Sequence, residues 1–205
     1  MSQYFENVNL PSEIKEYKTN FLGVSFTFKT DNGVFSKDGL DFGTRVMLEA
    51  LPLKDMSGDI LDLGCGYGVV SIILSKFLDA KFDAVDVNRR ALHLAEMNMK
   101  KNSVSGLNFF ESYCYENVSK KYDYIITNPP IRAGKKVVYE ILFGAKDHLK
   151  ENGVLYFVMR KEQGAKSAIR DLENLYNIEV LCKEKGFFVI KCNLRWQVEF
   201  CVVII

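Results

Sequence analysis

The sequence predicts an α/β fold with a mostly parallel sheet of seven strands, covered by helices on both faces. From Gly58 onward, short apolar segments alternate with amphipathic ones, which is the pattern of strands joined by crossover helices. Two further strands, at 177–183 and 187–192, flank the turn-like Glu184-Lys185-Gly186 and predict an antiparallel pair at the end of the sheet. A short β hairpin and a helix precede this core.

The expected elements follow in chain order. Residues 17–30 alternate aromatic and polar side chains and end in Asp31-Asn32-Gly33, which predicts a hairpin arm with a tight turn at these residues. Residues 40–51 have helical apolar spacing that stops at Pro52. In the core we expect strands at 60–63, 81–87, 107–110, 122–127 and 154–159, and helices at 69–78, 89–101 (with Asn88 as N-cap), 137–149 and 163–176.

Length and composition indicate one soluble globular unit. The chain has 205 residues, of which 48% are hydrophobic and 26% charged, and its formal net charge is +1. One buried core suits this length, so we expect a single domain with an N-terminal extension (1–52), a core (53–193) and a tail (194–205). The charge balance excludes a strongly basic protein but permits a local basic patch.

Cysteine and histidine usage narrows the chemistry. His93 and His148 are the two histidines, and they give no support to a Ser-His-Asp or zinc-water mechanism. Residues 1–9 lack a secretory signal and no apolar run approaches a membrane span, so we expect a cytoplasmic protein. Five scattered cysteines predict reduced thiols and no metal site: Cys65, Cys114, Cys182, Cys192 and Cys201.

A glycine-rich segment, Asp62-Leu63-Gly64-Cys65-Gly66-Tyr67-Gly68, lies between the first core strand and its helix. Its glycines allow a tight turn and close approach of the backbone to a ligand. A dinucleotide motif would place its third glycine at Val69, so a dehydrogenase is disfavoured. The Asp62 carboxylate would repel a pyrophosphate and attract an ammonium group, which favours S-adenosylmethionine.

Two later strand ends carry polar side chains. Asp86 ends the second core strand, where a carboxylate can accept both ribose hydroxyls, although it can also cap a helix. The strand at 122–127 runs into Asn128-Pro129-Pro130, whose prolines fix φ and lack N–H groups. The Asn128 amide oxygen is therefore placed to accept hydrogen bonds from a substrate NH2 group. Asn-Pro alone is common in turns. The functional prediction therefore depends on Asp62, the glycine segment, Asp86 and Asn128 occurring in this order at successive strand ends.

Several segments together resemble the class I S-adenosylmethionine-dependent methyltransferases. More narrowly, the chain is similar to the small methyltransferase-domain family that includes the small-subunit (16S) ribosomal RNA guanine-N2 methyltransferases. The resemblance implies a Rossmann-like fold, S-adenosylmethionine as cofactor, and ribosomal RNA or the small ribosomal subunit as partner. It spans about residues 4–193 and is carried by the segments 33–36, 40–45, 62–68, 84–88 and 127–135.

The resemblance also implies site residues. Ser112-Tyr113 stands where such proteins usually carry Ser-Asp, so either Tyr113 contacts the adenine or cofactor affinity is lower. The tail after Asn193 extends beyond the point, near the last strand, where such proteins usually end. The implied amine-binding residues are Asn128, Pro129, Pro130 and Ile131. The implied cofactor contacts are Phe35, Thr44, Asp62, Gly64, Cys65, Gly66, Gly68, Asp86, Val87, Tyr113 and Asn128.

Ile131 bears on the substrate, because relatives that act on adenine N6 or glutamine amides usually have an aromatic residue there. We therefore expect guanine N2 as the acceptor, with a glutamine-N5 or adenine-N6 methyltransferase as one alternative. A catalytically silent S-adenosylmethionine-binding RNA module is another, suggested by Tyr113 and the tail. The candidates for a base pocket are Phe35, Ile131 and Tyr139. The candidates for RNA phosphate contacts are Arg132, Lys135 and Lys136.

Overall fold

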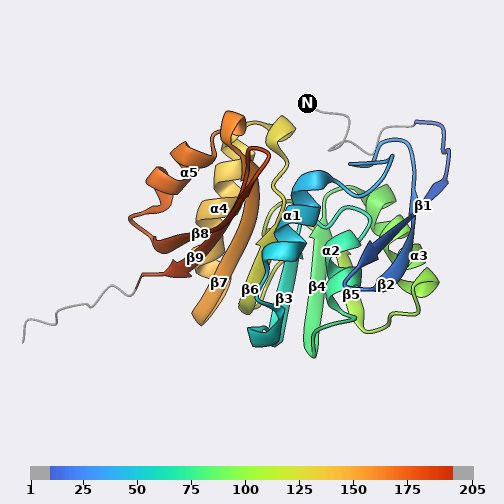
Figure 1. Cartoon of the computed structure of the whole chain (residues 1–205), viewed down its shortest axis with the longest axis horizontal. Coiled ribbons are helices and arrows are strands. Elements are labelled where there is room, and N and C mark those ends of the chain that lie inside the picture. The colour runs from blue at the N-terminus through green and yellow to red at the C-terminus, as the bar shows by residue number, and fades with distance from the viewer. Residues whose placement is uncertain (1–9, 196–205) are drawn as a thin grey trace, which may run out of the picture.

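The computed structural model describes residues 10–195 (Figure 1). The expectations for residues 1–9, for Cys201 and for the tail from 196 onward lie outside the described residues. Within residues 10–195, the four cysteines Cys65, Cys114, Cys182 and Cys192 are free thiols. No helix of residues 10–195 is long and apolar enough to cross a membrane.

The N-terminal hairpin forms a separate two-stranded sheet of β1 (Lys15–Phe21) and β2 (Val24–Thr30). Its turn is Leu22-Gly23, with both residues at positive φ (47° and 82°), which suits the twist of a two-residue hairpin. The hairpin therefore reverses at Leu22-Gly23, and the turn at Asp31-Asn32-Gly33 follows the end of β2 instead of joining the two strands. Asp31 accepts backbone N–H groups from Glu13 and Asn32 and anchors the chain where it leaves β2.

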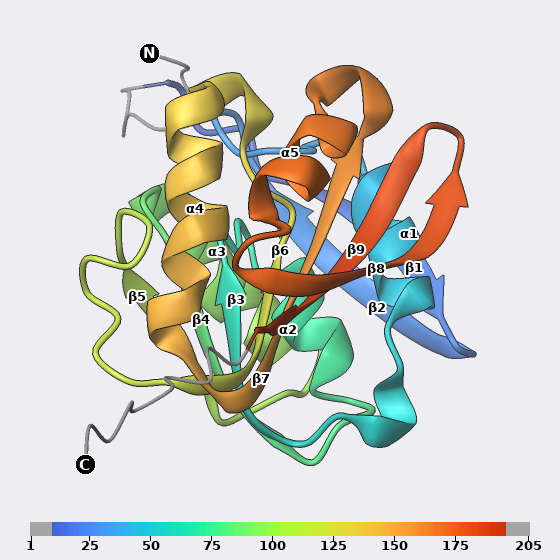
Figure 2. The same ribbon diagram turned by 90° about the vertical axis from the view of Figure 1, so that its left-hand side faces the viewer.

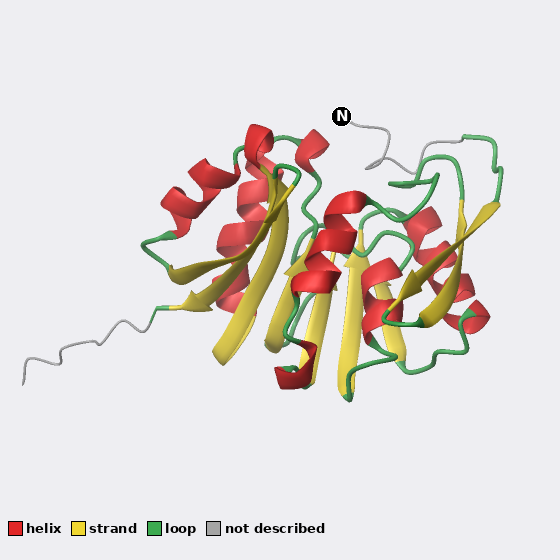
Figure 3. Cartoon of the chain, in the orientation of Figure 1, coloured by secondary structure: helices red, strands yellow, loops and turns green. Residues whose placement is uncertain are grey.

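The main sheet has the seven strands that the sequence predicts, in the spatial order β5-β4-β3-β6-β7-β9-β8. The pairs from β5 to β7 are parallel, whereas β9 is antiparallel to both β7 and β8. Figure 3 shows the strands side by side, with helices in front of and behind the sheet. The strands are β3 (Gly58–Leu63), β4 (Ala80–Asp86), β5 (Leu107–Glu111), β6 (Tyr122–Thr127), β7 (Leu149–Arg160), β8 (Tyr176–Glu184) and β9 (Phe187–Leu194).

Helices cover both faces of the sheet. Figure 2 shows α4 and α5 on one side and α1 with the hairpin on the other. Neighbouring strand residues point to opposite faces, so Ile60 joins the core under α1, α2 and α3, while Leu61 joins the core under α4 and α5. The helices are α1 (Phe42–Ala50), α2 (Val69–Leu74), α3 (Arg89–Lys101), α4 (Lys135–His148) and α5 (Ala165–Leu172).

Helices α2 and α5 are shorter than predicted, and α1 also lacks a few residues of the expected 40–51. After Leu74 the chain tightens into turns whose N–H groups bond three residues back, as from Lys76 to Ile73, so α2 does not reach residue 78. Gly164, with φ of 99°, separates a single turn at Lys161–Gln163 from α5 and delays the helix start. At the other end, Tyr176 already belongs to β8. The Asn88 N-cap is confirmed, because its side chain accepts the N–H of Arg90 at 3.0 Å.

Candidate functional site

A pocket of about 350 Å³ lies at the carboxyl ends of the parallel strands. The sheet order reverses here, since β4 and β5 continue to one side of β3 while β6 lies on its other side. Open α/β sheets bind ligands at such a reversal. The Thr127 hydroxyl joins the two strand ends by donating to the Leu63 carbonyl oxygen at 2.8 Å.

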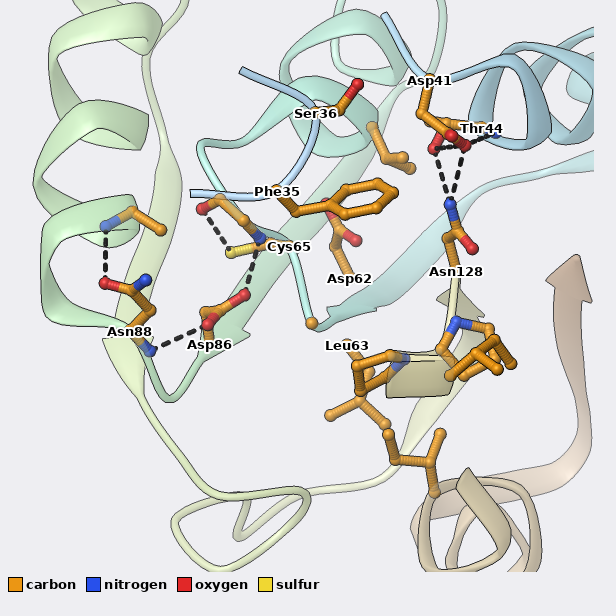
Figure 4. Close-up of a pocket in the computed structure, with 18 of the residues that line it drawn as sticks. Phe35, Ser36, Asp41, Thr44, Asp62, Leu63, Cys65, Asp86, Asn88 and Asn128 are labelled. Carbon is orange, nitrogen blue, oxygen red and sulfur yellow. Dashed lines mark hydrogen bonds between the residues drawn. The ribbon is translucent and has the colours of Figure 1, made fainter. Parts of the chain in front are cut away.

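The structure brings most of the predicted site residues to this pocket (Figure 4). Four candidates lie outside its lining, namely Gly68, Lys135, Lys136 and Tyr139. The predicted residues that line it are Phe35, Thr44, Asp62, Gly64, Cys65, Gly66, Asp86, Val87, Tyr113, Asn128, Pro129, Pro130, Ile131 and Arg132.

The glycine loop presents its backbone to the pocket. The N–H groups of Gly64 and Cys65 both donate to the Val85 carbonyl oxygen, at 2.8 and 2.9 Å, and this fixes the turn. Gly64 and Gly66 have φ of 75° and 55°, and a Cβ on either would meet nothing within 4 Å. That open space lies on the pocket side, so a ligand can approach the peptide groups closely.

Gly68 has a different task. It caps α2 in the left-handed conformation with φ of 85°, and a Cβ there would lie 3.0 to 3.3 Å from Ile72, Ala95 and Phe109. It therefore permits α2 to pack closely against α3 and β5. The glycine spacing thus combines ligand approach at two positions with helix packing at the third.

Two carboxylates lie at the ends of β3 and β4. Asp62 is buried and accepts the N–H of Ser71 at 3.0 Å. Burial raises the pKa of Asp62 to about 7, and the charge of Asp86 adds to the rise. Asp86 accepts the N–H groups of Gly66 and Asn88, both at 2.8 Å. Burial raises the pKa of Asp86 as well, against these hydrogen bonds.

Asn128 follows β6 and is held by the start of α1. Its Nδ2 donates to Asp41 Oδ2 at 3.0 Å and to Thr44 Oγ1 at 2.9 Å (Figure 4). Asp41 is itself the N-cap of α1 and accepts the Thr44 N–H at 2.8 Å. Both amide hydrogens are therefore used, which assigns the amide orientation and leaves the Asn128 Oδ1 as the acceptor available to a ligand.

A loop before α1 covers the glycine segment. Phe35 is 52% exposed and lines the pocket, and Ser36 follows it with φ of 53°. The Tyr67 hydroxyl donates to the Ser36 carbonyl oxygen at 3.0 Å and ties this loop to the glycine segment. Across the pocket, Tyr113 stands after β5, and its hydroxyl donates to Glu140 on α4 at 3.4 Å.

The basic residues separate into two groups. Arg132 lines the pocket, whereas Lys135 lies 4.6 Å from the ring centre of Tyr139. The Tyr139 hydroxyl donates to Asp171 at 2.7 Å, so this ring belongs to the α4–α5 contact rather than to a base pocket. Basic residues elsewhere form ion pairs within the protein, including Arg89 with Glu111, Lys101 with Glu16 and Lys120 with Asp83.

Sequence reasoning missed three contributors from distant segments. Asp41 orients Asn128, and the pocket also contains Arg160 from the end of β7 and Phe187 from the start of β9. The N-cap pattern of Asp41 before an apolar helix was visible in the sequence. The other two residues had no local motif, because the pairing of β7 with β9 brings them together.

The site contains two carboxylates that accept backbone N–H groups, those of Asp62 and Asp86, together with the oriented amide oxygen of Asn128 and several apolar side chains. These groups can bind a cationic, hydroxyl-bearing ligand beside an amine. The carboxylate next to Asn128 is that of Asp41, whose Oδ2 is already engaged by the Asn128 amide and the Thr44 N–H. No group of three His, Cys, Asp or Glu side chains in residues 10–195 is placed to hold a metal ion.

Comparison with known proteins adds the family. Residues 25–191 match the model of the methyltransferase small domain. The chain is 40% identical over 194 residues to the Bacillus subtilis protein named "Uncharacterized protein YbxB", covering 93% of this chain and 96% of that one. It is 32% identical to ribosomal RNA small subunit methyltransferase C of Colwellia psychrerythraea, covering 91% of this chain and 52% of that one.

Solved structures share the fold. A Thermus thermophilus 16S rRNA N2 G1207 methyltransferase in complex with AdoMet and guanosine superimposes with a TM-score of 0.80 at 24% identity, covering 92% of this chain and 52% of that one. A precorrin-6y C5,15-methyltransferase from Geobacter metallireducens has a TM-score of 0.63 at 20% identity, with 81% and 94% covered. The chain spans about half the length of the ribosomal RNA methyltransferases it matches.

Proposed function

The chain belongs to the methyltransferase small domain family of S-adenosylmethionine-dependent enzymes, and from this premise we propose that it methylates the exocyclic N2 amine of a guanine in ribosomal RNA. One observation carries the chemistry. The Asn128 side chain stands at the strand end beside the cofactor pocket with its NH2 group fully engaged and its carbonyl oxygen available. Such a group accepts a hydrogen bond from a substrate amine.

The pocket fits S-adenosylmethionine by its open glycine positions and its donor set. Gly64 and Gly66 leave room for a ligand against the backbone, and the Asp62 carboxylate suits an ammonium group. Asp86 uses each oxygen for one backbone N–H, and a carboxylate has lone pairs left for ribose hydroxyls. The Tyr113 ring would face the adenine in place of the usual Asp. Phe35, Thr44, Cys65 and Val87 would complete the contacts.

The reaction asks for alignment more than for proton transfer. Bound S-adenosylmethionine supplies a methyl group on a sulfonium, which an amine lone pair can attack in line. The Asn128 Oδ1 and the Pro129 carbonyl would accept the two amine hydrogens and so direct the lone pair. Proline at 129 and 130 keeps this corner stiff, and such positioning accounts for a large part of catalysis in bimolecular reactions.

Guanine and RNA are supported by the acceptor side of the pocket. Ile131 offers an apolar face to a flipped base, and Phe35 lines the same pocket. Arg132 lines the pocket, and Lys135 and Lys136 begin α4 shortly after it in the chain, where they would meet flanking phosphates. The curated relatives named as ribosomal RNA methyltransferases support the same substrate class.

Nucleoside mass spectrometry tests the proposal. Small ribosomal subunits from cells that lack the gene are incubated with the purified protein and labelled S-adenosylmethionine, and the RNA is then digested. We expect labelled N2-methylguanosine. Labelled N6-methyladenosine, or label in protein, would transfer the assignment to the adenine or glutamine class. Cofactor binding without any labelled product would indicate a silent binding module.

A further inference from the structure

Two cations lie over aromatic rings at the β7–β9 side of the pocket. The Arg160 guanidinium carbon is 5.0 Å from the ring centre of Phe187, and the Lys185 ammonium nitrogen is 4.8 Å from the ring centre of Phe42. The two ring centres are 5.6 Å apart, so neighbouring rings carry neighbouring cations. Arg160 and Phe187 line the same pocket as Asn128. We call these four residues the Arg160–Lys185 surface.

The rings of this surface are fixed by packing. A Cβ on Gly43 would lie 2.6 Å from Phe187, so this ring is pressed against the backbone of α1. The same turn of α1 contains Thr44, which holds Asn128. Cation–ring contacts restrain flexible side chains, and restrained cations lose less conformational entropy when they bind a ligand.

The charges of this surface are weakly compensated inside the protein. Arg160 pairs with Glu162 at 3.7 Å, but both side chains are largely exposed, and exposed pairs at this distance contribute little. Within residues 10–195, no carboxylate lies within 4.0 Å of the Lys185 ammonium. Two adjacent cations with one exposed counter-charge favour an anionic ligand.

The turn between β8 and β9 places Lys185 at an unusual backbone position. Lys185 and Gly186 have φ of 44° and 84°, which is a two-residue turn that favours Asn, Asp or Gly at its first position. Lys183 in the same hairpin lies 5.2 Å from the ring centre of Phe188, which packs into the core under α4 and α5. The hairpin therefore holds one lysine over a ring of α1 and another lysine over a ring of its own strand β9.

We propose that the Arg160–Lys185 surface binds the sugar–phosphate backbone of the RNA strand that leads into the pocket. This proposal rests on the RNA substrate proposed above and names a contact surface for it. Arg160 reaches the pocket from β7 and Arg132 reaches it from the segment after β6, so two cations from different segments are available to the phosphates that flank a flipped base. The Arg160 guanidinium also suits a single strand, because guanidinium planes can stack on its bases.

Fluorescence anisotropy with a labelled, guanosine-containing single-stranded RNA tests this surface across a range of salt concentrations. The double variant Arg160→Ala/Lys185→Ala is expected to bind the RNA roughly tenfold more weakly. Two lost single-strand phosphate contacts should also lower the slope of log K against log salt by about 1.4. Lys183→Ala is the matched control, since it removes a lysine over Phe188 in the same hairpin, and it should change neither quantity.

Further variants separate the outcomes. Arg160→Lys/Lys185→Arg keeps both charges and should retain most of the affinity, and all variants should bind S-adenosylmethionine like the wild type. If the wild type binds RNA and the double variant matches its affinity and salt slope, the surface is not used while the proposed function stands. If Lys183→Ala lost as much RNA affinity as the double variant, the effect would be explained by net charge and not by this surface. Failure of the wild type to bind or methylate RNA would overturn both proposals.

Discussion

The two halves of the pocket are built differently. On the cofactor half, the carboxylates of Asp62 and Asp86 each accept backbone N–H groups from the chain that surrounds them. On the acceptor half, one amide is held by the start of α1, and the exposed cations Arg132 and Arg160 line the same pocket. The first half is preorganised for one small ligand, and the second is open to a large charged one. The proposed reaction depends on Asn128, which lies where the halves meet.

The largest expected effect is on turnover and comes from this junction. Asn128→Ala removes the proposed acceptor of the substrate amine while leaving Asp62 and Asp86 in place. Loss of one positioned hydrogen-bonding group in an active site typically costs about 10² to 10³ in rate. Single-turnover methylation should fall by about this factor, and calorimetric affinity for S-adenosylmethionine should stay near the wild-type value.

Thr44 supplies the control for this prediction. Thr44→Ser keeps the hydroxyl that accepts from Asn128 Nδ2, so it should keep most of the rate, whereas Thr44→Val should lose part of it. A matching loss of cofactor affinity in Asn128→Ala would contradict the division of the pocket into two halves.

The next effect separates two glycines within the cofactor half. Gly68→Ala places a Cβ against Ile72, Ala95 and Phe109 and also strains a residue at φ of 85°, so it should lower the free energy of unfolding by about 3 kcal/mol. Gly66→Ala meets open space and should cost only the backbone strain, about 1 kcal/mol.

Cofactor affinity should respond in the opposite order. The methyl group that Gly66→Ala introduces would project into the ligand space. Per folded molecule, Gly66→Ala should therefore bind S-adenosylmethionine more weakly than Gly68→Ala. Chemical denaturation and titration calorimetry measure the two quantities. Equal stability losses would show that the third glycine has no special packing task.

The same division explains what the sequence could predict. The cofactor half is largely encoded in contiguous segments, so Asp62, the glycines and Asp86 could be placed at strand ends from local pattern. The acceptor half is assembled by tertiary pairing. Phe187 reaches the pocket because β9 pairs with β7, and no local signal specifies that. Tyr139 illustrates the converse, since its helical position suited a base pocket while packing directs its hydroxyl to Asp171.

A smaller effect concerns how the hairpin supports the cofactor half. Asn98 on α3 is fully buried; it accepts the Lys29 N–H and donates to the carbonyl oxygens of Lys29 and Tyr67. Asn102, one turn later, pairs with Thr27 in the same way but does not contact the glycine segment. Asn98 therefore links β2 to the cofactor loop, and Asn102 links it only to α3.

The pair gives a direct comparison. Asn98→Ala should lower the free energy of unfolding by about 2 kcal/mol through the unsatisfied carbonyls, and it should weaken S-adenosylmethionine binding roughly tenfold. Asn102→Ala should destabilise the protein less and leave cofactor affinity unchanged. Cofactor binding that falls equally in both variants would mean that hairpin docking, rather than the Tyr67 contact, supports the loop.

The smallest effect is a pH dependence that runs in opposite directions for folding and for binding. The pKa of Asp62 is about 7 in the folded protein, above its ordinary value of 3.8, so folding takes up a proton between these values. This group therefore makes the free protein less stable as pH rises from about 4 to about 7. A ligand ammonium needs the ionised carboxylate, so affinity should fall about threefold from roughly pH 7.5 to 6.5.

Asp62→Asn should bind S-adenosylmethionine weakly at both pH values, with little pH dependence. If that variant keeps the wild-type pH profile, the profile arises from Asp86 or from the ligand, and Asp62 is not the ammonium contact.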